Sequence, residues 1–138
     1  MDLSRDLICD NLSVTDGVLH FAGQSTAQLA QQYGTPLYLL DEDRIRERCR
    51  TYMNAMKEAF GPASLPLYAS KAASFKQIYR IMKEEGMGID VVSCGEIYTA
   101  KSANFPMEEI LSGITTLVIE EYLKASLQID LTGFPLNS

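Results

Sequence analysis

Short apolar runs alternate with helix-like segments through the middle of this chain, and that alternation limits the possible folds more than any other feature. The apolar runs are TPLYLLD, LPLYAS and GIDVVS, and a helix-like segment follows each of them within a few residues. Strands that alternate with helices in this order predict an α/β protein with a parallel sheet and right-handed crossovers. The order fits either a doubly wound sheet or part of a (β/α)8 barrel.

The predicted elements follow from the same pattern. We expect strands at 37–40, 65–70 and 88–93, and helices near 42–60, 74–86 and 95–103. The first of these helices is the clearest, because acidic residues lead it, apolar residues recur along one face and Gly61 ends it. Cys49 falls on the apolar face, which favours a packed thiol over a reactive one. Ser74 is the predicted cap of the second helix.

The N-terminal part of the chain has a different pattern. Residues 12–23 alternate apolar and polar side chains around Asp16 and Gly17, which predicts a β-hairpin. The segment STAQLAQQYG then predicts a short helix. His20 is the only histidine of the chain and lies on the hairpin, where we expect no chemical role for it.

Composition and charge exclude several classes of function. The 138 residues, 46% hydrophobic and 22% charged, are typical of a globular protein, and the net charge of −6 argues against a nucleic-acid or anionic-membrane partner. No basic leader precedes an apolar core, and no apolar run approaches the ~20 residues of a membrane helix. The cysteines Cys9, Cys49 and Cys94 have no metal-ligand spacing, so we expect no metal site and a cytoplasmic location.

A lysine stands where the second apolar run meets the second helix, in LPLYASKAASFKQI. Strand alternation places Leu67, Ala69 and Lys71 on one face. In both α/β architectures ligands bind at the C-terminal ends of the strands, and a partly desolvated amine there suits Schiff-base formation with an aldehyde. The alternative, on pattern alone, is an exposed lysine at a strand-to-helix turn.

Three segments, at 33–49, 67–75 and 88–103, carry a resemblance to one protein family. YGTPLYLLDEDRIRERC, LYASKAASF and GIDVVSCGEIYTAKSA resemble successive segments of the pyridoxal-phosphate decarboxylases and racemases with the alanine-racemase-type barrel. Within that family the diaminopimelate decarboxylases are the most similar. The resemblance covers residues 12–110 in one continuous order.

The resemblance implies a cofactor, a substrate class and site residues. Lys71 would hold pyridoxal 5'-phosphate, an amino acid would be the substrate, and members of the family are homodimers. Asp90 and Glu96 match acids near the cofactor lysine, and we expect all three to converge at the C-terminal edge of the sheet. The alternatives are a strand-end turn residue for Asp90 and a first-turn helix acid for Glu96. Ala73 departs from the family, which commonly has Asn there.

Two further expectations concern the ends of the resemblance. Ser93 and Gly95 are expected to shape the turn after the third strand. The predicted domains are an N-terminal hairpin segment (1–24) that would join a β-rich domain, a partial (β/α)8 barrel of about three units (25–110) and a divergent tail (111–138). The tail carries no histidine, whereas the family has a His-Gly-Asn segment at this point.

The function implied by the resemblance is pyridoxal-phosphate-dependent decarboxylation of meso-diaminopimelate to lysine. Because about three of eight barrel units are present, we expect this chain to be inactive by itself. The alternatives are an ornithine or arginine decarboxylase of the same family, a non-catalytic remnant with an interaction surface at its sheet edge, and a single-domain pyridoxal-phosphate carrier.

Overall fold

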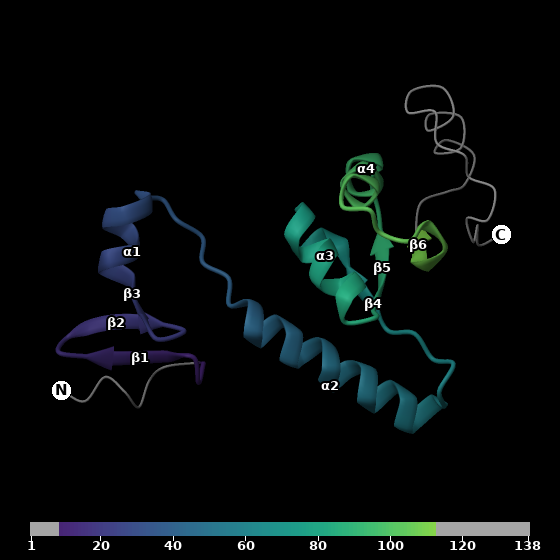
Figure 1. The fold of residues 1–138 in the computed structure, drawn as a ribbon, viewed down its shortest axis with the longest axis horizontal. Helices are drawn as coiled ribbons and strands as arrows, with labels where there is room; N and C mark the ends of the chain where they lie inside the picture. Colours follow the sequence, from purple (N-terminus) through teal and green to yellow (C-terminus); the bar gives the residue numbers. More distant parts are fainter. Residues whose placement is uncertain (1–8, 113–138) are drawn as a thin grey trace. The chain divides into compact units, whose positions relative to one another are not determined.

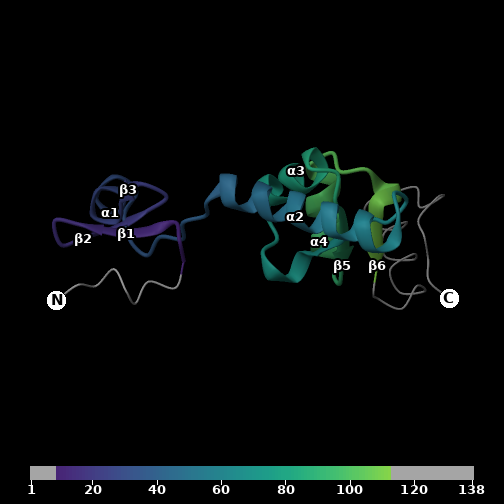
Figure 2. The ribbon, with the colours of Figure 1, turned by 90° about the horizontal axis from the view of Figure 1, so that it is seen from below.

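The structure, a computed structural model, describes residues 9–112 (Figure 1 and Figure 2). The chain divides between Glu42 and Asp43 into two compact units, which are described separately below. The predicted tail lies outside the described residues except at its first two positions. The predicted division of the chain into 1–24, 25–110 and 111–138 stays a prediction.

The first unit is a small antiparallel sheet with one helix (Figure 1). Its elements are β1 (Leu12–Thr15), β2 (Val18–Phe21), β3 (Gln24–Ser25) and α1 (Thr26–Tyr33). Asp16 and Gly17 join β1 to β2 with positive φ angles of 51° and 76°, which is the turn geometry that twists two antiparallel strands correctly. The predicted hairpin is therefore confirmed. His20 lies on β2, where its Nδ1 atom is 3.0 Å from the carbonyl oxygen of Val18.

The second unit is an α/β arrangement around a parallel sheet, as predicted (Figure 1). Its elements are α2 (Glu42–Phe60), β4 (Leu67–Ala69), the 3₁₀ turn η2 (Ser70–Ala72), α3 (Lys76–Glu84), β5 (Gly88–Val91), α4 (Cys94–Ser102), η3 (Met107–Glu109) and β6 (Ile110–Ser112). The sheet order is β4-β5-β6, and both neighbouring pairs are parallel. The prediction that 65–70 and 88–93 contain adjacent parallel strands is confirmed.

One predicted strand was wrong. Residues 37–40 form no strand in the structure, and within the described part of the chain they have no strand partner. Tyr38 is 95% exposed and Leu40 58% exposed. An apolar run becomes a strand only where a neighbouring strand takes up its backbone hydrogen bonds, and here that neighbour is missing. The third strand of the sheet is instead β6, at the point where the resemblance was expected to stop.

The core of the second unit lies between the sheet and its helices. α3 contacts both β5 and α4. The inward side chains of β5, Ile89 and Val91, are completely buried. The buried residues of α3 are Ile78, Tyr79, Ile81 and Met82. Gly88 opens β5 without a side chain, and the backbone of η3 passes close to it.

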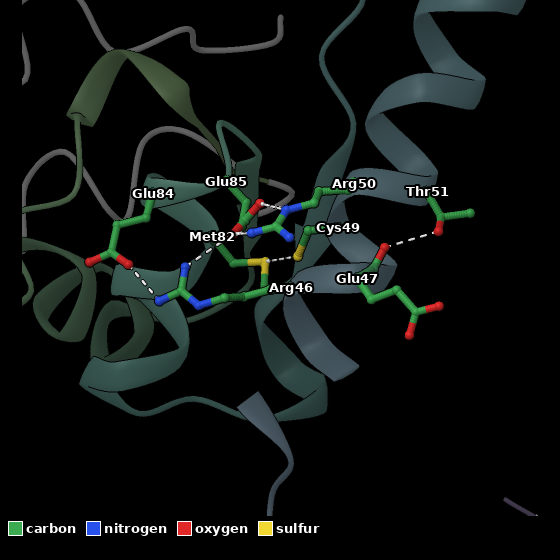
Figure 3. Close-up of polar contacts among 8 residues, drawn as sticks. All are labelled: Arg46, Glu47, Cys49, Arg50, Thr51, Met82, Glu84 and Glu85. Atoms are coloured by element: carbon green, nitrogen blue, oxygen red, sulfur yellow. Dashed lines mark hydrogen bonds and ion pairs between the residues drawn. The ribbon is translucent and has the colours of Figure 1, made fainter. Parts of the chain in front are cut away.

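Helix α2 packs on α3 through sulfur atoms. The Cys49 thiol is buried and lies 3.6 Å from the sulfur of Met82 (Figure 3). Burial, with a smaller contribution from the negative charge of Glu85, raises the pKa of the Cys49 thiol. The prediction that Cys49 is a packed thiol is confirmed by this burial.

An ion-pair network joins the same two helices beside the sulfur contact (Figure 3). Arg46 of α2 contacts Glu84 at 2.6 Å and Glu85 at 3.0 Å. Arg50, one turn further along α2, contacts the two carboxylate oxygens of Glu85 at 2.8 Å and 2.9 Å. The hydrogen bond from Arg50, followed by that from Arg46, lowers the pKa of Glu85. Glu85 is therefore the shared acceptor that ties α2 to the C-terminal end of α3.

Candidate functional site

The C-terminal ends of β4 and β5 carry the predicted site residues. β4 ends at Ala69, and the single 3₁₀ turn η2 follows it at once, with Lys71 at its centre. The Lys71 side chain is exposed, and η2 contacts β5. Lys71 therefore lies at the edge of a parallel sheet where α/β proteins place their ligands, as the sequence predicted.

Asp90 lies on the neighbouring strand. In the parallel register of β4 and β5, Asp90 is the partner of Ala69, two residues before Lys71. Its Oδ1 atom is buried and has no hydrogen-bond partner in the described part of the chain. The hydroxyl of Ser70, a completely buried residue, is likewise without a partner there. Buried polar atoms without partners are rare and call for an explanation, either structural or functional.

Glu96 makes capping contacts at the start of α4. Its Oε2 atom accepts a hydrogen bond of 2.6 Å from the backbone N–H of Val92, and its own backbone N–H donates to the Ser93 hydroxyl at 3.2 Å. Ser93 is the N-cap residue of α4, so the prediction that Ser93 shapes this turn is confirmed. The Glu96 side chain is buried and fixes the path of the chain directly after β5.

The turn that carries Lys71 is also held by side-chain contacts that the sequence did not predict. The Tyr68 hydroxyl donates to the carbonyl oxygen of Ala73 at 3.1 Å, and the Tyr79 hydroxyl lies 2.9 Å from the Ser74 hydroxyl. The prediction that Ser74 caps the second helix was wrong, because the N-cap residue of α3 is Phe75. No spacing signal reveals such contacts, since they depend on the path of the turn.

The structure thus brings the predicted residues to one edge of the sheet without pairing their charges. Within residues 9–112, no ion pair joins Lys71 to Asp90 or to Glu96. The same residues hold no group of three or more acidic, histidine or cysteine side chains that suits a metal ion. No helix among them is long and apolar enough to cross a membrane.

Known proteins are similar to this chain in sequence and in fold. Residues 42–129, more than half of the chain, match the family described as "Pyridoxal-dependent decarboxylase, pyridoxal binding domain". Diaminopimelate decarboxylase from Bacillus methanolicus is 47% identical over 94 residues, which cover 68% of this chain and 22% of that protein. The family match runs past Ile110, where the resemblance was expected to stop.

Two solved structures are also similar to this chain. The crystal structure of diaminopimelate decarboxylase from Methanocaldococcus jannaschii in complex with L-lysine matches with a TM-score of 0.63 and 33% identity, over 75% of this chain and 24% of that one. The crystal structure of AQ1208 from Aquifex aeolicus matches with a TM-score of 0.69 and 35% identity, over 90% of this chain and 29% of that one. This chain spans less than a third of the length of each of these relatives.

Proposed function

This chain belongs to the pyridoxal-dependent decarboxylase family, and from that premise we propose that it forms the cofactor-holding part of an enzyme that decarboxylates meso-diaminopimelate to lysine. The observation that carries the proposal is the position of Lys71, directly after β4 and beside a strand that carries a buried, unpartnered carboxylate oxygen of Asp90. The three parallel strands would be successive units of a (β/α)8 barrel. Relatives named diaminopimelate decarboxylase support this substrate over others.

The residues present fit pyridoxal 5'-phosphate. Lys71 offers an exposed amine, which is the group that bonds the cofactor aldehyde, and Asp90 offers an acceptor that no described group satisfies. When bound, the cofactor supplies an electron-accepting ring that takes up the electrons released as a carboxylate leaves as carbon dioxide.

Each residue of the site has a separate role in the proposal. Lys71 would hold the cofactor through its side-chain nitrogen and would keep that nitrogen as a free amine beside the site when an amino acid is bound there. Asp90 would offer a hydrogen-bond acceptor beside that nitrogen, since its Oδ1 atom has no partner among the described residues. Glu96 was also predicted to contact the cofactor. Its bonds to Val92 and Ser93 support a narrower contribution, which is to fix the turn that follows Asp90 and β5.

Several features of the complete enzyme remain predictions. They are the homodimer, the cytoplasmic location and the choice of diaminopimelate over ornithine or arginine. A non-catalytic remnant is the alternative that the experiment below separates from an enzyme.

The test is a chimera. Residues 42–129 replace the matching segment of the Bacillus methanolicus enzyme, and carbon dioxide release from meso-diaminopimelate is measured. We expect activity in the chimera, loss of at least about a thousand-fold on Lys71→Ala, and near-normal activity for the control Lys76→Ala, which removes an exposed lysine at the start of α3. A folded chimera that is inactive, or one whose activity survives Lys71→Ala, would refute the proposal.

A further inference from the structure

The turn that carries Lys71 is tied by a tyrosine hydroxyl at each end. On the strand side, the Tyr68 hydroxyl reaches over the turn and donates to the Ala73 carbonyl oxygen at 3.1 Å. On the helix side, the hydroxyls of Tyr79 and Ser74 share a hydrogen bond of 2.9 Å. These two hydrogen bonds, called the tyrosine brace below, enclose residues 70–75.

Both tyrosines are anchored in the core of the second unit. Tyr79 is completely buried among the apolar residues of α3, and Tyr68 is half-buried against the same core. Burial raises the pKa of the Tyr68 phenol, so this hydroxyl keeps its proton and remains a donor to the carbonyl. The tyrosine brace therefore links the turn to the closely packed core of the second unit.

Within the part of the chain that the structure describes, no other side-chain hydrogen bond is made to residues 70–75. η2 is a single 3₁₀ turn, and Ala73 after it is extended, with φ −159° and ψ 116°. Phe75 is the N-cap residue of α3 but makes no side-chain capping bond. The side chain of Ala73 cannot form a hydrogen bond. The Tyr68 hydroxyl therefore bonds to the backbone carbonyl of this residue.

We propose that Tyr68 and Tyr79 are positioning residues that hold the Lys71 turn in the conformation needed for cofactor bonding. A turn that already has the bound conformation loses no conformational entropy when the cofactor binds. If the turn is loosened, only a fraction of the molecules can bind, and the apparent affinity for the cofactor falls in proportion to that fraction. The inference rests on the proposed role of Lys71 and adds to it two residues that act by holding the turn.

The first measurement is amide hydrogen exchange in the whole chain. Tyr68→Phe and Ser74→Ala each delete one bond of the tyrosine brace, and Ser74 is exposed, so its replacement disturbs the core least. Tyr52→Phe is the control, because Tyr52 is a 61% exposed tyrosine of α2. We expect exchange at residues 70–75 to rise about five-fold in each variant while the amides of β5 keep their rates. Rates equal to those of Tyr52→Phe, or an equal rise in β5, would overturn the proposal.

The second measurement separates positioning from stability. The chain is incubated with pyridoxal 5'-phosphate, reduced with borohydride and digested, and the label on Lys71 is divided by the label on exposed Lys57 of α2. We expect this ratio to fall about five-fold in Tyr68→Phe and in Ser74→Ala, but not in Tyr52→Phe. An unchanged ratio together with faster exchange at 70–75 would overturn the positioning role.

The two proposals fail in different ways. If Lys71 of the unaltered chain takes no more label than Lys57, the proposed function fails, and the exchange rates still decide whether the tyrosine brace holds the turn. If Lys71 is labelled selectively but neither readout responds to Tyr68→Phe and Ser74→Ala, only the tyrosine brace is refuted.

Discussion

Ala69 and Asp90 lie side by side as register partners in β4 and β5, and the carboxylate of Asp90 therefore projects from the strand next to the one that leads into Lys71. A buried charged oxygen without a partner lowers the stability of a fold. Buried polar groups without hydrogen-bond partners are found mostly at functional sites, where their cost in stability is offset by a role in binding or catalysis.

Replacing Asp90 separates its effect on the stability of the fold from its effect on cofactor binding. In Asp90→Asn we expect the free energy of unfolding to stay the same or to rise by up to about 1 kcal/mol, because the uncompensated charge is gone. Trapping of pyridoxal 5'-phosphate on Lys71 should fall about ten-fold, since the negatively charged hydrogen-bond acceptor beside Lys71 is lost. Urea unfolding and borohydride labelling measure the two quantities. A loss of more than about 2 kcal/mol would identify Asp90 as a structural residue instead.

Gly88 is predicted to tolerate no side chain. A Cβ atom at this position would lie 2.5 Å from a methyl carbon of Leu67 and 2.9 Å from the backbone oxygen of Glu109, and the second contact cannot be relieved by a rotamer change. We expect Gly88→Ala to lower the free energy of unfolding by about 1–3 kcal/mol in urea melts. Gly95→Ala is the control, because a Cβ on that helical residue meets only Ser93 Oγ at 3.9 Å. Equal stabilities for the two variants would contradict the packing seen around Gly88.

Strands β4 and β5 were predictable because each is a short apolar run followed by a helix-like segment. Strand β6 was not predicted. The strand expected at 37–40 has the same apolar composition, but composition does not show whether a neighbouring strand exists. Lys71 was singled out because it follows an apolar run where a helix begins, and Asp90 was identified only through the family resemblance. The contacts of Tyr68 were not predictable, because a hydroxyl that meets a carbonyl depends on the path of an irregular turn.

The network around Glu85 predicts a pH-dependent stability. Its arginine bonds lower the Glu85 pKa below the usual 4.5, so Glu85 stabilises the fold above that pH, and the contribution is lost as pH falls through the folded-state value. We expect Glu85→Gln to cost about 1–2 kcal/mol near pH 7 and progressively less as the pH falls below 4.5, by urea unfolding. Glu47→Gln is the control, since Glu47 pairs only with Arg44 on the exposed face of α2. A cost for Glu85→Gln that is the same at both pH values would rule out this linkage.

Cys49 should react slowly with thiol reagents. Its thiol is buried and its pKa is raised, so less of it is present as the reactive thiolate at any pH, whereas Cys9 is exposed. With iodoacetamide near pH 8, we expect Cys9 to be alkylated at least about ten times faster than Cys49, as followed by peptide mass spectrometry. In concentrated urea the two rates should become similar. Similar rates without urea would mean that α2 separates readily from α3.

The partners in each bond of the tyrosine brace are only five positions apart in the chain, Tyr68 with Ala73 and Ser74 with Tyr79. Both hydrogen bonds of the Lys71 turn therefore lie within residues 68–79, although the rings of Tyr68 and Tyr79 pack on a core that other segments complete. Contacts between residues so near in the chain close short loops, which costs little conformational entropy during folding.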